Sequence, residues 1–441
     1  MSFTVDVERR FAIRGRAALD SALRDRFSDR RSNGASFRSI VDLGRLFFCE
    51  YVTLSFSIQG PLTVGCLYSA TGPTASVERT QLNATLLAIE EINASGGVAG
   101  REVVALQYDA KSEPAQFSAL AERMLDHDRA DLLIGCYMTN TRQAVVPVVE
   151  RRSCLLSYAA PYEGFEYSPN VVYGGAVPNQ HSLLLARHLM SERGKRFYLV
   201  GTRYTFPIES NRVMSALVAE RKGQVVAERY VPLGVSRREL DQVVQDIARK
   251  QPDVVFSTVV GDAAGIFCEL CAEAGLTTTI TFAGLTLTEA ELDAMPPGLA
   301  AGHLTAATYF QSIDTPENHR FVHAYQARFG AQERLNAMAE TAYLVTHLTL
   351  GAIARCESTS PEAVCGELAR MSFRAPQGEV RFDPENNHLY LWPRIGRAEA
   401  DNQFTIVRDV SAPVKPDPYL VTHSLEDWAD SDVDASLVPG I

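Results

Sequence analysis

Strand-like and helix-like segments alternate along residues 62–283, and this alternation limits the fold more than any other feature of the sequence. Short apolar runs such as 62–69 and 103–108 are separated by segments whose apolar residues recur at helical spacing. This order is typical of strand–helix–strand units, which build parallel sheets with helices on both faces. Because there are too many units for one sheet, and a second series begins after residues 173–175, we predict an α/β fold of two similar lobes with a cleft between them.

Residues 131–170 place hydroxyl side chains where such a fold binds ligands. The stretch contains two apolar runs, 132–137 and 154–159, and each run ends in small and hydroxyl residues. Tyr137 and Tyr158 stand at the carboxyl ends of the two predicted strands. Open α/β sheets bind ligands at that edge, so we expect a pocket for a small neutral molecule there.

The charge and hydropathy of the chain exclude two classes of partner. The 441 residues carry a formal net charge of −11, whereas direct nucleic-acid binding needs clustered Lys and Arg to displace counterions. No apolar run approaches the ~20 residues of a membrane-spanning helix, so no membrane insertion is expected. Residues 1–50 nevertheless hold ten Arg and seven acids. We interpret residues 1–59 as a poorly ordered, Arg-rich N-terminal extension, with an Arg-rich interaction arm as the alternative.

Two features favour the cytoplasm. Residues 1–40 lack the continuous apolar core of a secretory signal. The eight cysteines as a set fit a reducing compartment, since several of them, such as Cys66 and Cys136, lie in apolar runs. Cys268 and Cys271 have the spacing of a redox motif but lie within a helical pattern, so we interpret them as structural. Export to the periplasm is the alternative.

Motifs for catalysis or cofactor binding are missing from the sequence. There is no glycine fingerprint after a strand, no phosphate-binding loop, no HExxH and no GxSxG. His319 and His323 share a helix face but have no third ligand nearby, and we interpret them as solvated. Glu163 and Glu166 are interpreted as solvated loop charges rather than as a general acid–base pair. We therefore predict a binding protein that is not an enzyme, with no cofactor and no metal site.

Several strings resemble one known family of binding proteins. They include LTVGCLYSATG at 62–72, PYEGFEYSPN at 161–170 and DVVFSTVVG at 253–261, and the likeness extends from about residue 61 to 428. The chain resembles the amide-sensing negative regulators of bacterial aliphatic amidase operons (the AmiC group), which belong to the type I periplasmic-binding-protein family. The resemblance implies two Rossmann-like lobes with parallel sheets, joined by three crossovers, that close on a ligand in the cleft. It also implies the domain bounds, which are 60–177 with 308–375 for lobe 1, 178–307 with 376–430 for lobe 2, and 431–441 for a tail.

The family pocket falls, position by position, on six uncharged residues: Tyr137, Thr139, Tyr158, Ala160, Tyr204 and Thr286. Hydroxyl groups can both donate to and accept from a primary amide, and tyrosine rings supply apolar walls. The tyrosines also fit a core position and the threonines a helix start, so these structural roles stay as alternatives. Three positions depart from the family pattern, because Ala160 replaces a threonine, Asp262 an uncharged residue and Phe206 a tyrosine.

Two roles follow from the resemblance. As a regulator, the protein would bind a small neutral amide or urea-like ligand and pass the change of lobe angle to an RNA-binding antiterminator protein. The alternative is the substrate-binding component of an ABC transporter for short-chain amides, urea or branched-chain amino acids, which would deliver its ligand to a membrane permease. We expect the regulator role, in the cytoplasm, and leave a homodimer open.

Overall fold

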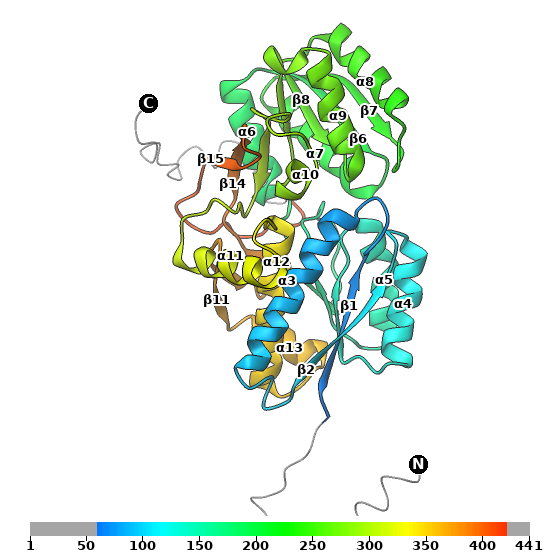
Figure 1. Cartoon of the computed structure of the whole chain (residues 1–441), viewed down its shortest axis with the longest axis vertical. Coiled ribbons are helices and arrows are strands. Elements are labelled where there is room, and N and C mark those ends of the chain that lie inside the picture. Colours follow the sequence, from blue (N-terminus) through cyan, green and yellow to red (C-terminus); the bar gives the residue numbers. More distant parts are fainter. Residues whose placement is uncertain (1–59, 421–441) are drawn as a thin grey trace, which may run out of the picture. The chain divides into compact units, whose positions relative to one another are not determined.

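The computed structural model describes residues 60–420, which form two lobes (Figure 1). The predicted extension 1–59 and the predicted tail 431–441 lie outside the described residues. Helices and strands alternate in both lobes, and the predicted α/β fold with parallel sheets is confirmed. No helix within residues 60–420 is long and apolar enough to cross a membrane.

The first lobe is built on a five-stranded sheet in which all neighbouring strands are parallel. In spatial order the strands are β2 (Val103–Asp109), β1 (Leu62–Tyr68), β3 (Leu132–Gly135), β4 (Leu156–Tyr158) and β5 (Val171–Tyr173). The helices of this lobe are α3 (Ala75–Ala94), α4 (Pro114–Asp126), α5 (Thr139–Arg151), α11 (Pro316–Phe329), α12 (Ala337–Cys356) and α13 (Pro361–Leu368). Leu132, Leu133 and Ile134 are fully buried, as expected for a parallel strand covered on both faces.

The second lobe is built on a seven-stranded sheet in which five neighbouring strands are parallel, and the two remaining strands, at one end of the sheet, each pair antiparallel with the strand before them. In spatial order the strands are β15 (Phe404–Arg408), β14 (Arg394–Ala398), β10 (Leu304–Ala307), β9 (Thr281–Gly284), β8 (Val254–Thr258), β6 (Arg196–Thr202) and β7 (Gln224–Val231). The helices are η1 (Pro178–Gln180), α6 (Ser182–Glu192), α7 (Thr205–Glu220), α8 (Arg237–Lys250), α9 (Asp262–Glu273), η2 (Leu276–Thr278) and α10 (Glu289–Asp293). A small antiparallel sheet contains β11 (Ser372–Ala375), β12 (Gly378–Phe382) and β13 (Leu389–Tyr390).

The chain passes between the two main sheets three times. It leaves the first sheet after β5 and enters the second lobe at η1. It returns after β10 to α11 and α12, and α12 packs against α3 and β4 of the first lobe. It passes over once more between β13 and β14. Such connecting segments are where a change of lobe angle is absorbed.

The two lobes touch at the loop between β8 and α9. Gly261 in this loop has a φ of +66°, and a Cβ built on it would lie 2.3 Å from the carbonyl oxygen of Pro73, just before α3. Glycine adopts this backbone conformation without strain and leaves room for the close approach. The carboxyl-end loops of β1 and β8 are therefore in direct contact.

Candidate functional site

A sharp turn after β3 directs residues of the first lobe toward the second. Gly135 has a φ of +140°, and a Cβ built on it would lie 2.2 Å from the carbonyl oxygen of Leu67. Cys136 follows with a φ of +63°. The chain thus leaves the sheet directly after β3 and begins α5 at Thr139, with Tyr137 in the connection.

Residues from both lobes line one small cavity. Tyr204 immediately precedes α7, and Thr286 follows β9. With Tyr137 and Thr139 they line a cavity of about 10 Å³, which is room for about one water molecule. The other lining residues are also uncharged, namely Pro161, Phe206, Leu285 and Met338. The lobes are therefore closed on a narrow space without a charged wall.

A second cavity of about 20 Å³ adjoins the first, because the same Pro161, Phe206, Leu285 and Met338 line both. Its further walls include four alanines, Ala176, Ala306, Ala307 and Ala337. His181 also lines it, and the buried Nε2 atom of this ring has no hydrogen-bond partner among the described residues. Burial lowers the pKa of His181 to about 4, so the ring is neutral at pH 7. The interlobe space therefore continues from a hydroxyl-lined part into a largely apolar part.

Two of the six predicted pocket residues, Tyr158 and Ala160, do not line either cavity. Tyr158 is fully buried, and its hydroxyl donates to the carbonyl oxygen of Tyr137 at 2.9 Å. Ala160 is also fully buried. Its backbone packs closely on Gly175, since a Cβ built on Gly175 would lie 2.0 Å from the carbonyl carbon of Ala160. The structure brings the other four together at one cavity. A role in ligand binding stays a prediction for all six.

The cavity hydroxyls differ in whether they have partners. Thr139 donates to Glu163 Oε2 at 2.6 Å, and Thr286 donates to the carbonyl oxygen of Val259 at 2.8 Å. The hydroxyls of Tyr137 and Tyr204 have no hydrogen-bond partner among residues 60–420, and burial raises the pKa of both phenols well above the ordinary value. The two tyrosines therefore face the cavity as neutral groups that can donate or accept.

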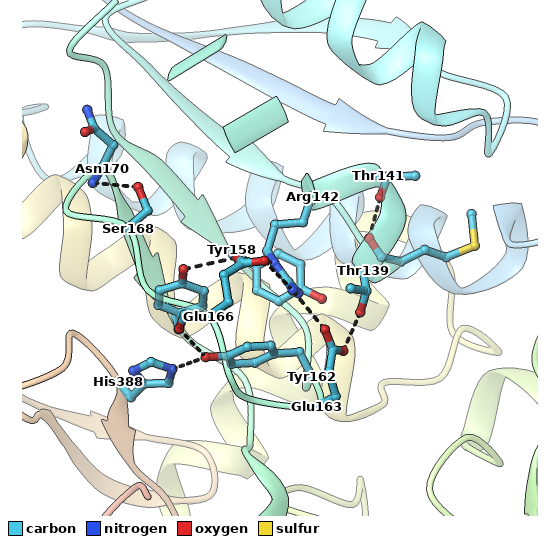
Figure 2. A network of polar contacts seen from close by, with 12 residues as sticks. Thr139, Thr141, Arg142, Tyr158, Tyr162, Glu163, Glu166, Ser168, Asn170 and His388 are labelled. Atoms are coloured by element: carbon cyan, nitrogen blue, oxygen red, sulfur yellow. Dashed lines mark hydrogen bonds and ion pairs between the residues drawn. The ribbon is translucent and has the colours of Figure 1, made fainter. Parts of the chain in front are cut away.

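The interpretation of Glu163 and Glu166 as solvated loop charges is wrong. Both pair with Arg142 of α5, whose side chain is fully buried (Figure 2). Arg142 donates from Nη2 to Glu163 Oε1 at 3.2 Å, and from Nε and Nη2 to the two carboxylate oxygens of Glu166 at 2.8 and 3.1 Å. The side chain of Glu163 is 4 % exposed and that of Glu166 is 21 % exposed. A buried ion cluster thus stands behind Thr139.

Aromatic rings enclose this ion cluster. The guanidinium carbon of Arg142 lies 4.7 Å from the ring centre of Tyr158 and 4.6 Å from that of Tyr162. Tyr162 and Tyr173 stack on each other and on His388. Burial lowers the pKa of His388 to about 4. Its Nδ1–H donates to the carbonyl oxygen of Asn386 at 2.6 Å, so its Nε2 accepts from the Tyr162 hydroxyl at 2.6 Å.

Other residues considered in the sequence lie elsewhere. Asp262 is the first residue of α9, is exposed, and lines neither cavity. His319 pairs with Asp314 at 3.2 Å on an exposed surface. Within residues 60–420 no group of three or more His, Cys, Asp or Glu residues could hold a metal ion.

Comparison with protein families gives one match that covers most of the chain. Residues 62–425 match the profile described as "Periplasmic binding protein domain". The "Leu/Ile/Val-binding protein homolog 6" of Brucella suis is 26% identical over 286 residues, which are 63% of this chain and 73% of that protein. The "Limonene hydroxylase" of Geobacillus stearothermophilus is 33% identical over 133 residues, 30% of this chain, but the match spans only 24% of that protein.

A solved structure shows the same fold. It is the solute-binding protein of an ABC transporter from Rhodopseudomonas palustris BisB5, in complex with 3,4-dihydroxybenzoic acid. The TM-score is 0.74 with 22% sequence identity, and the match covers 81% of this chain and 99% of the other. At this identity the likeness establishes the fold alone.

Proposed function

The chain belongs to the periplasmic binding protein family, and from this premise we propose that it is a solute-binding protein that closes its two lobes on a small uncharged ligand. The observation that carries the proposal is the cavity between the lobes. Its hydroxyl-bearing walls come from both lobes, with Tyr137 and Thr139 on one side and Tyr204 and Thr286 on the other. A ligand that touches both lobes stabilises the closed state over the open state, and this differential affinity is what a binding protein communicates.

The lining favours an amide or urea-like ligand over an amino acid. An amino acid presents an ammonium and a carboxylate group, and burying either without a charged partner is costly. None of the residues that line the two cavities is an Asp, Glu, Lys or Arg. Primary amides and ureas instead present N–H donors and a carbonyl acceptor without net charge, and hydroxyl groups match both.

The comparisons support transport over regulation. The proteins similar to this chain include the "Leu/Ile/Val-binding protein homolog 6" of Brucella suis and the solute-binding protein of an ABC transporter from Rhodopseudomonas palustris. The proposed role is therefore to deliver a ligand to an ABC permease, without turnover, which implies a periplasmic location. The cytoplasmic regulator of the AmiC group, with its RNA-binding antiterminator partner, is favoured by the sequence resemblance and by the cysteine pattern.

Calorimetric titration tests the ligand class. Acetamide, butyramide and urea are expected to bind and to raise the melting temperature, because a ligand that binds only the native state stabilises it. Leucine and isoleucine are the charged controls, and an assay for released ammonia tests for turnover. Binding of leucine with no response to any neutral probe would overturn the proposal, and so would ammonia release from acetamide or urea.

Fractionation of cells that produce the full chain tests the role. A periplasmic pool is expected for a transport component. A purely cytoplasmic pool that co-purifies with an RNA-binding protein would instead favour the regulator.

A further inference from the structure

The hydroxyl group of Thr139 has only one direction in which to donate. Its Oγ1 lies 2.6 Å from Glu163 Oε2, and an ionised carboxylate accepts hydrogen bonds but cannot donate. The single hydroxyl hydrogen therefore points away from the cavity and toward Glu163. Toward the cavity that Thr139 lines, the oxygen presents lone pairs only.

Arg142 bonds the second carboxylate oxygen of Glu163. Its guanidinium is permanently charged. Arg142 Nη2 donates to Glu163 Oε1 at 3.2 Å, whereas Thr139 donates to the other carboxylate oxygen, Oε2. Burial opposes the charge of Arg142, but neighbouring Tyr158, Glu163 and Glu166 outweigh it and hold the pKa of Arg142 above its ordinary value. Figure 2 shows the continuous path from Arg142 through Glu163 to Thr139.

The ion cluster is also fixed in place. Glu166 takes two hydrogen bonds from Arg142, and the guanidinium also lies over the rings of Tyr158 and Tyr162. Planar, bidentate contacts of this kind fix geometry as well as charge. The bond to Glu163 sets the orientation of the Thr139 hydroxyl before any ligand arrives.

We propose that Glu163 is a positioning residue for ligand selection: by accepting the hydroxyl hydrogen of Thr139, it makes that hydroxyl an acceptor toward the cavity, which then selects ligands that donate an N–H or O–H at this point. The inference rests on the proposed function, because it concerns the same cavity. Thr286 follows the same rule from the other lobe, since it donates to the carbonyl oxygen of Val259. A ligand with only an acceptor here would place two oxygens against each other, and a buried polar group without a partner is disfavoured.

Glu163→Gln is the direct test, because it preserves shape and reverses the polarity. The glutamine oxygen is expected to face Arg142, which leaves the amide N–H₂ to donate to Thr139 and frees the threonine hydrogen to point into the cavity. Acetamide and acetone are suitable probes, since they share a shape and differ in the N–H₂ group. We expect the ratio of acetamide affinity to acetone affinity, measured by calorimetric competition, to fall about tenfold in the variant.

Glu166→Gln is the matched control. It removes the same charge from the same Arg142 but leaves the bond between Thr139 and Glu163 untouched. The affinity ratio is expected to stay within about twofold of the parent, since the cavity hydroxyl keeps its orientation. An equal fall of the affinity ratio in both variants would mean that loss of the negative charge, rather than reversal of the Thr139 hydrogen bond, causes the change. This result would overturn the inference.

Two threonine variants make the test independent of how well Glu163→Gln folds. Thr139→Val removes the hydroxyl and is expected to lower the ratio, and on that background Glu163→Gln should change the ratio no further, as for two residues that act through one contact. Thr139→Ser restores a hydroxyl and should restore the ratio. An unchanged ratio in folded Glu163→Gln or in folded Thr139→Val overturns the inference. Failure of the parent protein to bind acetamide and urea at all overturns the proposed ligand class instead.

Discussion

Tyr204 carries one of the two cavity hydroxyls that have no hydrogen-bond partner among the described residues. Tyr204→Phe is expected to weaken acetamide binding by ~0.5–1.5 kcal/mol, which is the net contribution of one hydrogen bond. The melting temperature of the free protein should stay close to that of the parent, because no protein contact of the hydroxyl is lost. Titration calorimetry checks the affinity.

Tyr230→Phe is a control for this change, since the Tyr230 hydroxyl bonds Glu228 and the residue lines neither cavity. It should leave acetamide binding as it is. If Tyr204→Phe bound acetamide as tightly as this control, Tyr204 would not contact the ligand.

For single residues, the sequence predicts a position when the residues that determine it are close together in the chain. Tyr137 and Tyr204 follow apolar runs, so their place at carboxyl strand ends can be predicted from adjacent residues. The ion cluster cannot be predicted in this way, because Glu163 and Glu166 lie 21 and 24 positions beyond Arg142. They meet only when α5, β4 and the following loop fold back on one another. The composition of this loop, which is rich in Gly, Pro and Tyr, therefore does not indicate that its two glutamates pair with a buried arginine.

At the scale of single elements, α5 offers a direct comparison between a buried and an exposed ion pair. Arg142→Met would leave the carboxylates of Glu163 and Glu166 without their cation, and removing one partner of a buried pair costs about 3–5 kcal/mol. Arg151→Met on the same helix removes an exposed pair with Glu122, and such pairs contribute about 0–1 kcal/mol. Unfolding in guanidinium chloride checks both, with a lower midpoint and an unchanged slope expected for Arg142→Met. Equal midpoints in the two variants would contradict the view that the cluster is a structural unit.

Glu340 makes the first turn of α12 sensitive to pH. It is fully buried, it accepts from Gln377 Nε2 at 2.8 Å, and burial raises its pKa to about 8. The unfolded value is about 4.3, so the folded state holds a proton that the unfolded state releases. This contribution to stability is complete below about pH 4.3 and is lost as the pH rises toward 8, by up to ~1.4 kcal/mol per pH unit.

Glu340→Gln should therefore flatten the fall in the free energy of unfolding between pH 6.5 and 8. His181 and His388, whose pKa values are lowered by burial to about 4, are neutral throughout this window and do not mask the effect. Glu362→Gln is the control, because Glu362 occupies the first turn of α13 and is exposed. Parallel stability curves for the parent and Glu340→Gln would rule out a protonated Glu340.

Element boundaries show where a local pattern misleads. The apolar run 389–395 predicts one strand, but it spans β13 and only the first two residues of β14, and these strands belong to different sheets. Pro393 lies between them and has no N–H to donate to a ladder. The chain crosses from one lobe to the other at this point, so the run is a connection rather than a single strand.

At the scale of the whole molecule, the sequence predicts two lobes but not how tightly they close. The alternation of strands and helices is enough for the lobes, because each unit buries its own apolar face. The narrow interlobe space depends on contacts between residues far apart in the chain, such as Pro73 and Gly261. This contact offers a test of whether closure and ligand binding are linked.

Gly261→Ala is expected to weaken ligand binding by preventing full closure. The new methyl group would lie 2.3 Å from the carbonyl oxygen of Pro73, and backbone atoms on both sides leave little room to move. With a φ of +66° and a ψ of −155°, Gly261 has a backbone conformation that is essentially confined to glycine, so a Cβ also adds strain of roughly 1–3 kcal/mol. Gly275→Ala separates the two effects, because Gly275 has a φ of +69° and no atom within 4 Å of the added methyl group. Both variants should lose stability from strain, and Gly261→Ala should lose more, because Gly275 lies in the left-handed region that other residues can also adopt. Only Gly261→Ala should bind acetamide more weakly and fail to contract in small-angle X-ray scattering when acetamide is added. Equal acetamide affinity in the two glycine variants would mean that the ligand does not require the Pro73–Gly261 contact, and closure at that point would then be a property of the free protein alone.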